Sequence, residues 1–216
     1  LTGMLDLYND GDNSLLPAKL FYLEEKIKHI FKSYKLNEIR TPVLEDTNLF
    51  IRSVGRASDI VNKELYSFSD RNDKGIALRP EGTASVIRSI VEKKLDQSNH
   101  KLWYLGPMWR YERPQKGRYR QFNQAGVEIL GIPEGMPEFE MISIVCSIIK
   151  EFNLENCTIK INHLGNQKSK ESFCNALIDF LEPHNKLLDE KDNQRLEKNP
   201  LRVLDTKNTN TQEILK

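Results

Sequence analysis

The sequence lacks both of the glycine-rich loops that many nucleotide-binding folds use to hold phosphate, G-x-x-x-x-G-K-[ST] and G-x-G-x-x-G. It has only three cysteines and no Cys-x-x-Cys spacing, which favours reduced thiols over a disulfide framework or a zinc site. No apolar run approaches 18 residues, and the N-terminus has no basic-then-apolar signal. The net charge of +1 excludes binding to nucleic acid through overall charge. We therefore expect a cytoplasmic protein with no membrane partner, whose ligand contacts are local.

The first half of the chain shows clear local patterns. Apolar residues recur at three- and four-residue steps over Pro17–Tyr34, which predicts an amphipathic helix. Glu38–Leu44 is typical of a strand, and because Pro42 cannot donate to a ladder we expect it at a sheet edge or a subunit contact. Two apolar runs flank the turn sequence Asp70–Gly75 and predict a β-hairpin, and Thr83 is expected to cap the next helix.

The remaining elements are joined mainly by hairpins. We expect strands at Lys101–Leu105, Met108–Glu112, Phe122–Leu130 and Cys157–Asn162, and helices at Ala84–Leu95, Pro137–Phe152, Ser169–Leu181 and Asn185–Glu197. Helices that are segregated from hairpin-linked strands indicate an α+β fold, an antiparallel sheet flanked by helices. The chain becomes more charged after Gly165, so we expect one domain at 1–164 and the start of a helical insertion or subdomain at 165–216.

A cationic hairpin is the most informative feature of the sequence. Between Met108 and Gln121 there are five Lys or Arg residues and one Glu, in a chain that is nearly neutral. Guanidinium groups at fixed positions are typical of phosphate binding, which predicts a nucleotide site. Strand alternation places Arg110 and Glu112 on one face, together with Phe122, Gln124, Gly126 and Glu128 of the partner strand. We expect the bare backbone at Gly126 to admit a ligand. The structural alternative is an exposed sheet surface with an Arg110–Glu128 ion pair.

Several segments together resemble one enzyme family. Trp109–Phe122 resembles motif 2 of class II aminoacyl-tRNA synthetases, and Pro17–Leu44 resembles their motif 1. Arg79–Thr83, Lys116–Phe122 and Asn199–Asp205 resemble the histidyl-tRNA synthetase family in particular. The resemblance runs from about Gly3 to the C-terminus. It implies a class II catalytic core and a ligase that activates histidine with ATP to histidyl-adenylate and transfers it to the 3′ end of tRNA(His).

The resemblance also implies roles at the nucleotide end of the site. Arg110 is the implied catalytic residue, which bridges the carboxylate of histidine and the α-phosphate of ATP and stabilises the charge that develops there. Glu112 accepts from the adenine amino group, Phe122 stacks on adenine, and Arg118 holds the outer phosphates. The implied cofactors are ATP and Mg²⁺, the latter without assignable ligands in this chain.

At the amino-acid end, the resemblance implies that Glu81, Thr83 and Gln124 bind the α-amino group of histidine, that Arg110 binds its carboxylate and that Glu128 binds its imidazole. A carboxylate opposite the ring selects a side chain with an N–H donor. Structural alternatives stay open: Glu81 and Thr83 suit the first turn of a helix, and Phe122 suits a core. The histidines at 29, 100, 163 and 184 have no spacing for a metal site or a catalytic triad and are interpreted as structural.

The resemblance implies macromolecular partners as well. The loop Arg113–Gln121 would reach the acceptor end of tRNA(His) through phosphate contacts of Arg113, Lys116 and Arg120. Motif 1 implies a homodimer formed through Pro17–Leu44.

Two departures from the family concern the ends of the chain. The first segment has Thr2-Gly3-Met4 where the family has Arg-Gly before Met, and the polar stretch Asn9–Ser14 follows it. Motif 3, the Arg-Gly-Leu-Asp-Tyr-Tyr segment and the anticodon-binding domain do not occur in the sequence. Because each lost cation removes about 3 kcal/mol of transition-state stabilisation, we expect an incomplete enzyme that is inactive, or nearly so, by itself.

Two other functions fit parts of the sequence. A histidine-sensing regulatory subunit of ATP phosphoribosyltransferase shares the catalytic fold, but has no need of the cationic loop or of Arg110, Glu112 and Phe122. A non-catalytic nucleotide- or RNA-binding module predicts phosphate affinity with a steep salt dependence and no selectivity for histidine.

Overall fold

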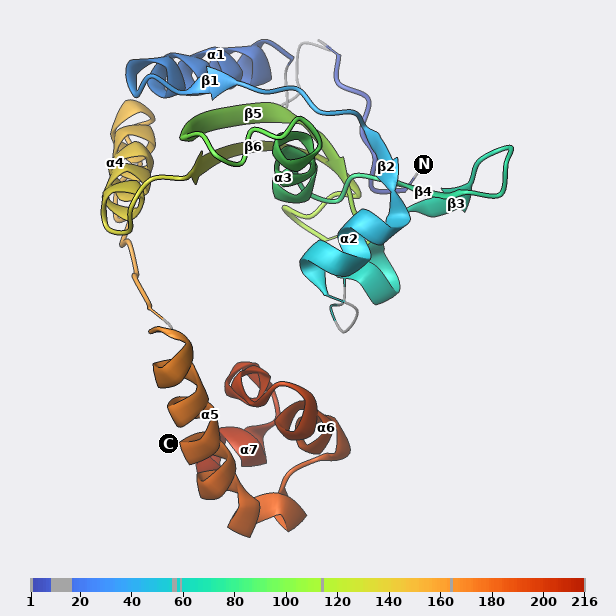
Figure 1. Ribbon diagram of the computed structural model, residues 1–216, viewed down its shortest axis with the longest axis vertical. Coiled ribbons are helices and arrows are strands. Elements are labelled where there is room, and N and C mark those ends of the chain that lie inside the picture. The colour runs from blue at the N-terminus through green and yellow to red at the C-terminus, as the bar shows by residue number, and fades with distance from the viewer. Residues whose placement is uncertain are drawn as a thin grey trace. The chain divides into compact units, whose positions relative to one another are not determined.

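The computed structural model describes residues 2–8, 17–55, 58, 60–113, 115–163 and 165–215. The polar stretch Asn9–Ser14 and Pro114 of the cationic loop lie outside these residues. The chain divides into two compact units, Leu1–Cys157 and Thr158–Lys216 (Figure 1). The sequence placed this division at Gly165, later along the same connecting segment. The identity of the second unit as an insertion stays a prediction.

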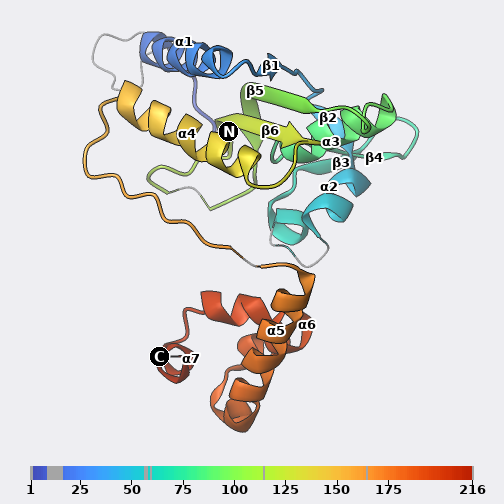
Figure 2. The same cartoon turned by 60° about the vertical axis from the view of Figure 1, so that its left-hand side comes forward.

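The larger sheet of the first unit has the strand order β1-β5-β6. Strand β1 (Asn37–Glu38) runs parallel to β5 (His100–Trp109), and β5 is antiparallel to β6 (Gln121–Leu130). The register pairs Tyr104 with Gly126 and Met108 with Phe122. The predicted class, an α+β fold with a sheet flanked by helices, is confirmed (Figures 1 and 2).

Helices cover both faces of this sheet and bury a different core on each. On one face, α1 (Pro17–Ser33) and α4 (Met136–Glu151) contribute Ile27, Phe31 and Ile144, which pack with Trp103 of β5. On the other face, α3 (Thr83–Glu92) packs through Val86 and Ile90 against Leu102, Tyr104 and Met108 of β5. The second face is the one that carries the polar residues singled out in the sequence.

The smaller sheet contains the predicted hairpin. Its strand order is β2-β4-β3. Strands β2 (Leu44–Asp46) and β3 (Ser67–Ser69) each run antiparallel to the central strand β4 (Gly75–Leu78). The Asp70 carboxylate accepts hydrogen bonds from the amides of Asn72 and Lys74 and fixes the turn. Helix α2 (Thr47–Val54), capped by the Asp46 side chain, and a π-helical turn at Ile60–Glu64 connect β2 to β3.

The side chain and backbone of Arg79 connect the two sheets. Its Nε donates to Pro107 O at 3.1 Å, and its Nη1 donates to Thr41 O at 2.9 Å. Its own amide donates to Val43 O, and its carbonyl accepts from the amide of Trp109. The side chain is 8% exposed. Arg79 thus binds the chain between β1 and β2 to the end of β5.

Four of the predicted strands differ from those in the structure. Glu38–Leu44 is divided between β1 and β2, because Pro42 has no amide to donate and Arg79 binds the carbonyls beside it. The two strands expected at Lys101–Leu105 and Met108–Glu112 are the single strand β5, which ends at Trp109. Cys157–Asn162 forms no strand, since none of the described residues pairs with it in a ladder.

The second unit is helical. It comprises α5 (Gln167–Leu181), a 3-10 turn (Glu182–Leu187), α6 (Glu190–Lys198), a 3-10 turn (Pro200–Asp205) and α7 (Thr209–Ile214). Leu177, Leu181, Leu188, Leu196 and Val203 form its core. The helix expected at Asn185–Glu197 is interrupted, because Leu188 is extended and the Asp189 carboxylate caps α6 through the amide of Asp192.

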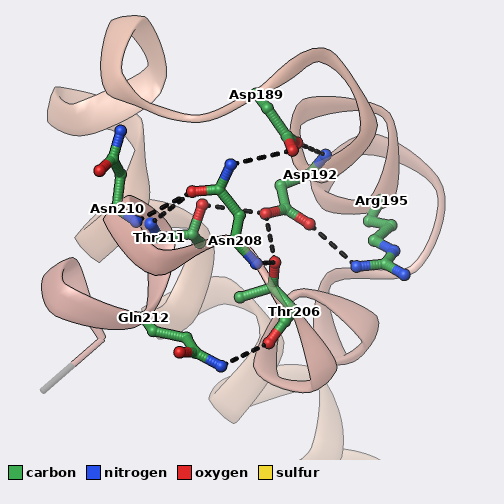
Figure 3. A network of polar contacts seen from close by, with 8 residues as sticks. All are labelled: Asp189, Asp192, Arg195, Thr206, Asn208, Asn210, Thr211 and Gln212. Atoms are coloured by element: carbon green, nitrogen blue, oxygen red, sulfur yellow. Dashed lines mark hydrogen bonds and ion pairs between the residues drawn. The ribbon is translucent and has the colours of Figure 1, made fainter.

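A buried carboxylate organises this unit. Asp192 is 1% exposed and accepts from the hydroxyls of Thr206 (2.5 Å) and Thr211 (2.9 Å), and Arg195 lies 2.9 Å from its other oxygen (Figure 3). Although burial alone raises the pKa of Asp192, these hydrogen bonds and the ion pair hold its pKa below the usual value. Asp192 thus joins α6 to Thr206, which precedes α7, and to Thr211, which lies within α7.

Candidate functional site: the N-terminus of α3 against β6

The first part of the site is the turn that leads into α3. The Glu81 carboxylate accepts from the amides of Thr83 at 2.7 Å and Ala84 at 2.9 Å. Glu81 therefore satisfies amides that the helix leaves free at its N-terminus. The expectation that Thr83 caps the helix was wrong, because Gly82 holds the cap position and the Thr83 hydroxyl points elsewhere.

The second part is the face of β6 that α3 covers. Gln124 Oε1 accepts from the amide of Gly82 at 3.2 Å, and the Thr83 hydroxyl donates to Glu128 Oε1 at 2.7 Å. The predicted common face of Phe122, Gln124 and Glu128 is confirmed by these contacts and by the register of β6. Hydrogen bonds of 2.7–3.2 Å thus connect the turn before α3 with β6. They bring together four of the predicted histidine-binding side chains, those of Glu81, Thr83, Gln124 and Glu128.

The electrostatics of Glu128 differ from those of an exposed carboxylate. The pKa of Glu128 is raised, mainly by burial and further by the nearby Glu81 carboxylate. The hydrogen bond from Thr83 and, to a smaller extent, the Tyr104 hydroxyl oppose this rise. Among the described residues Glu128 has no ion pair, so the alternative of an Arg110–Glu128 pair is excluded. A half-buried carboxylate without a cation favours a ligand that brings an N–H donor.

Arg110 lies beyond the end of β5 and on the same face. Its Nε donates to Pro80 O at 2.9 Å, which leaves the two terminal nitrogens for other partners. The guanidinium carbon lies 5.3 Å from the centre of the Phe122 ring, and Nη1 lies 4.0 Å from Glu112 Oε1. Arg118 donates to the other oxygen of Glu112 at 3.2 Å. The four predicted ATP-binding residues therefore form one cluster.

The predicted tRNA-contacting cations are not equivalent. Arg113 and Lys116 are exposed, as a contact with phosphate requires. Arg120 is instead half-buried: its guanidinium carbon lies 3.8 Å from the centre of the Tyr111 ring, and its Nε donates to Glu112 O. The amide of Arg120 also donates to Gly3 O. Arg120 thus fixes the base of the loop in this structure, and a tRNA contact by it stays a prediction.

A cavity of about 870 Å³ opens over this site. The predicted ligand-binding residues that line it are Glu81, Thr83, Arg110 and Gln124. The opposite wall comes from α2 and from the exposed side of α3, with Leu49, Arg52, Ile87 and Arg88. Its lining therefore combines carboxylate and amide acceptors with guanidinium donors, as a zwitterionic ligand joined to phosphate requires.

Sequence reasoning missed Tyr104 and misread Gly126. A Cβ on Gly126 would lie 2.2 Å from Tyr104 Cζ, so the ring of Tyr104, and not a ligand, fills the space beside this glycine. The signal that could have found this was the strand register: a tyrosine that faces a glycine across an antiparallel pair has room to lie over the bare backbone.

Solved structures with a similar fold define the class of protein. Apo histidyl-tRNA synthetase of S. aureus matches with a TM-score of 0.71 at 34% identity, over 97% of this chain and 50% of that one. An ATP phosphoribosyltransferase regulatory subunit/histidyl-tRNA synthetase of Bacillus halodurans matches with a TM-score of 0.64 at 21% identity, over 94% of this chain and 54% of that one, which shows the fold alone. The fold is that of the class II aminoacyl-tRNA synthetases.

Sequence comparison identifies the family. The family model described as histidyl-tRNA synthetase matches residues 16–209. The histidine–tRNA ligase of Francisella philomiragia is 46% identical to this chain over 211 residues, which are 95% of this chain and 50% of that protein. The histidine–tRNA ligase of Prochlorococcus marinus is also 46% identical, over 217 residues, which are 100% of this chain and 50% of that protein. The chain belongs to the histidyl-tRNA synthetase family. It spans about half the length of these curated relatives.

Proposed function

We propose that the chain carries the part of a histidine–tRNA ligase that binds histidine and ATP for adenylate formation, before transfer to the 3′ end of tRNA(His). The single observation that carries the proposal is the convergence of Glu81, Thr83, Gln124 and Arg110 on one cavity, with Glu128 bonded to Thr83. Acceptors for an ammonium and a guanidinium for a carboxylate and a phosphate lie on the same sheet face.

At the nucleotide end, we expect ATP to separate the ion pair between Glu112 and Arg118. The Arg118 side chain is 63% exposed and the Glu112 side chain 19%, so the contact is accessible from the Arg118 side, where ATP would replace it. Glu112 would then accept from the adenine amino group, Phe122 would stack on the ring, and Arg118 would bind the outer phosphates. Arg110 would neutralise the charge that develops as the carboxylate attacks the α-phosphate.

Mg²⁺ is implied by the family. Within the part of the chain that the structure describes, no cluster of three or more His, Cys, Asp or Glu side chains is placed to hold a metal ion. Mg²⁺ commonly enters such sites bound to substrate phosphates, so ATP would bring the ion with it.

Partners and location follow from the same proposal. Exposed Arg113 and Lys116 would bind phosphates of the tRNA acceptor end. A homodimer would cover the apolar side chains that Pro17–Leu44 leaves exposed, such as Phe21 at 65% and Tyr22 at 56%. None of the helices described is long and apolar enough to cross a membrane. We place the activity in the cytoplasm.

The test is a histidine-dependent pyrophosphate-exchange assay. Because the chain spans half of its relatives, it should be measured both alone and as a chimera, in which it replaces the matching half of the F. philomiragia ligase. We expect exchange from the chimera and almost none from the chain alone. A chimera that folds without exchange would overturn the proposal, and exchange by the isolated chain at the rate of an intact enzyme would overturn the expectation that the chain is inactive by itself.

Two substitutions in the chimera separate the roles. Arg110→Ala should abolish adenylate formation, whereas Arg71→Ala, at an exposed arginine of the β3–β4 turn, should leave it unchanged. Glu128→Gln should raise the KM for histidine far more than the KM for ATP. If the KM for ATP rose and that for histidine held, the assignment of Glu128 to the amino acid would be wrong.

A further inference from the structure

The N-terminal segment of the chain is bonded to the base of the cationic loop, which is formed by Arg110–Glu112 and Arg120–Gln121. The carbonyl of Gly3 accepts from the amides of Arg120, at 2.6 Å, and Gln121, at 3.3 Å. Gly3 has a φ of 77°, and a Cβ built on it would lie 2.9 Å from Arg120 Cγ and 3.2 Å from Arg120 N. Only glycine meets both conditions without strain. The contact therefore requires glycine at position 3, and it fixes the start of β6.

Arg120 fixes the other side of the same loop base. Its guanidinium carbon lies 3.8 Å from the centre of the Tyr111 ring, and its Nε donates to Glu112 O at 3.1 Å. Its carbonyl accepts from the amide of Arg110 at 2.9 Å. An arginine suits this arrangement, because its planar guanidinium can stack on a ring and donate in its own plane at the same time. Arg120 thus contacts three consecutive residues, two of which are predicted to bind ATP.

Tyr111 is in turn held by a segment outside the loop. Its ring makes an edge contact with the ring of Tyr66, with 5.4 Å between the centroids, and its amide donates to Glu64 O at 2.7 Å. Glu64 ends the π-helical turn, and Tyr66 comes shortly before β3. The loop base is therefore bonded both to the N-terminal segment and to the connection that leads into β3.

We propose that Gly3 and Arg120 are positioning residues of the ATP site, which hold the two predicted adenine-binding residues in the arrangement that receives the base. The inference rests on the proposed function for the identity of the ligand. Phe122 directly follows Gln121, whose amide is bonded to Gly3. The carbonyl of Glu112 accepts from Arg120. Both adenine-binding residues are therefore fixed before ATP arrives, and ATP binds without the cost of ordering them.

The first experiment tests the contact of Gly3 without any assay of function. Hydrogen exchange of the amides of Arg120 and Gln121 is measured by NMR in the 216-residue chain and in the variant Gly3→Ala, whose added methyl group must displace the N-terminal segment from the loop base. We expect both amides to exchange about tenfold faster in the variant, because their acceptor moves away. Unchanged exchange would overturn the proposal.

Gly135→Ala is the matched control. Gly135, at the start of α4, has a φ of 93°, but a Cβ built on it meets no atom within 4 Å. The variant thus has the backbone strain of an alanine at positive φ without the steric contact, and should leave exchange at Arg120 and Gln121 unchanged. Equally fast exchange of these amides in both variants would mean that strain loosens the whole unit, and would count against a specific role for Gly3.

The second experiment measures ATP binding in the chimera with the F. philomiragia ligase. Arg120→Lys keeps the positive charge, but lysine cannot stack on Tyr111 and donate to Glu112 O at once. In pyrophosphate exchange, the KM for ATP should rise about tenfold, the scale of one hydrogen bond to a charged group, with the KM for histidine within about twofold. Gly3→Ala should give the same division between the two KM values.

The exchange assay contains no tRNA, so a phosphate contact of Arg120 with tRNA cannot contribute to its result. Arg71→Lys, the same substitution at an exposed arginine of the β3–β4 turn, should change neither KM. An unchanged KM for ATP in Arg120→Lys or Gly3→Ala, or an equal rise in both KM values, would overturn the positioning role of that residue.

The two experiments separate the further inference from the proposed function. If the unsubstituted chimera shows no histidine-dependent pyrophosphate exchange, the proposed function fails, and hydrogen exchange still supports or overturns the fixing of the loop base by Gly3. If the chimera is active but the variants leave the amides of Arg120 and Gln121 and the KM for ATP unchanged, the further inference fails and the proposed function stands.

Discussion

Glu128 in the first unit and Asp192 in the second are carboxylates in similar surroundings with opposite pKa shifts. Each accepts from threonine hydroxyls, Glu128 from Thr83 and Asp192 from Thr206 and Thr211. The pKa of Glu128 is raised mainly by burial, whereas that of Asp192 is lowered in spite of burial. Hydrogen bonds from Thr206 and Thr211 lower the pKa of Asp192 most, and Arg195 at 2.9 Å lowers it further. Within the described part of the chain Glu128 has no cation beside it, and the Glu81 carboxylate nearby raises its pKa instead.

This difference separates a structural carboxylate from one suited to a ligand. Both carboxylate oxygens of Asp192 accept hydrogen bonds from side chains of its own unit (Figure 3). Asp192 therefore holds the helices of this unit together and is not suited to bind a ligand. Glu128 is held in place by Thr83 but has no cation of the described residues beside it, so an imidazole N–H could donate to its carboxylate. Carboxylate chemistry thus serves stability in the second unit and, in our proposal, recognition in the first.

The largest effect should come from deleting the structural carboxylate. Asp192→Ala leaves two buried hydroxyls and Arg195 without their acceptor, and should lower the free energy of unfolding by about 3 kcal/mol. Urea unfolding followed by circular dichroism, with hydrogen exchange of amides in α5–α7, measures it. Asp179→Ala, on the exposed side of α5, should stay within about 0.5 kcal/mol. Equal effects of the two substitutions would remove the basis for the comparison.

A smaller effect should follow from making Asp192 resemble Glu128. Arg195→Met keeps the packing of the side-chain stem and removes the cation, so the pKa of Asp192 should rise and the free energy of unfolding should fall by about 1–2 kcal/mol. NMR titration of the carboxyl reports the pKa. Lys191→Met, at an exposed position of the same helix, should change neither quantity. An unchanged pKa in Arg195→Met would show that the hydroxyls alone lower it.

The smallest effect, with the opposite sign, is expected at Glu128. A carboxyl whose folded-state pKa is raised above 4.5 destabilises the fold at neutral pH, and this cost disappears as the pH falls through the folded-state pKa. Glu128→Gln should therefore raise the free energy of unfolding at neutral pH by up to about 0.5 kcal/mol, with no gain in acid. Asp192 acts in reverse: its contribution is complete above 3.8 and is lost below it. Unfolding measured across this range tests both signs, and a destabilised Glu128→Gln at neutral pH contradicts the first.

Sequence periodicity was sufficient where one pattern decided the structure. Helix α1, the β3–β4 hairpin and the shared face of Phe122, Gln124 and Glu128 all follow from local alternation and turn chemistry. The family was also correctly identified from motif 2 with Arg79–Thr83 and Asn199–Asp205.

The sequence failed where distant residues decide. Glu81, and not Thr83, accepts from the amides at the start of α3, because the Thr83 hydroxyl donates to the Glu128 carboxylate on β6. The half-buried position of Arg120, against the Tyr111 ring and the Gly3 carbonyl, could not be predicted from the loop sequence either, although its tRNA contact stays a prediction. No spacing within a motif reveals such pairings, since their partners come from other elements.

Arg79 has a mechanical consequence for the site. Its carbonyl bonds the amide of Trp109, the residue directly before Arg110, while its side chain and amide hold Thr41 and Val43 on the path into the smaller sheet. Arg79 therefore bonds the end of the smaller sheet both to the connection between β1 and β2 and to the strand end that presents Arg110. We expect the position of Arg110, the group proposed to bind the α-phosphate, to depend on how the smaller sheet is held.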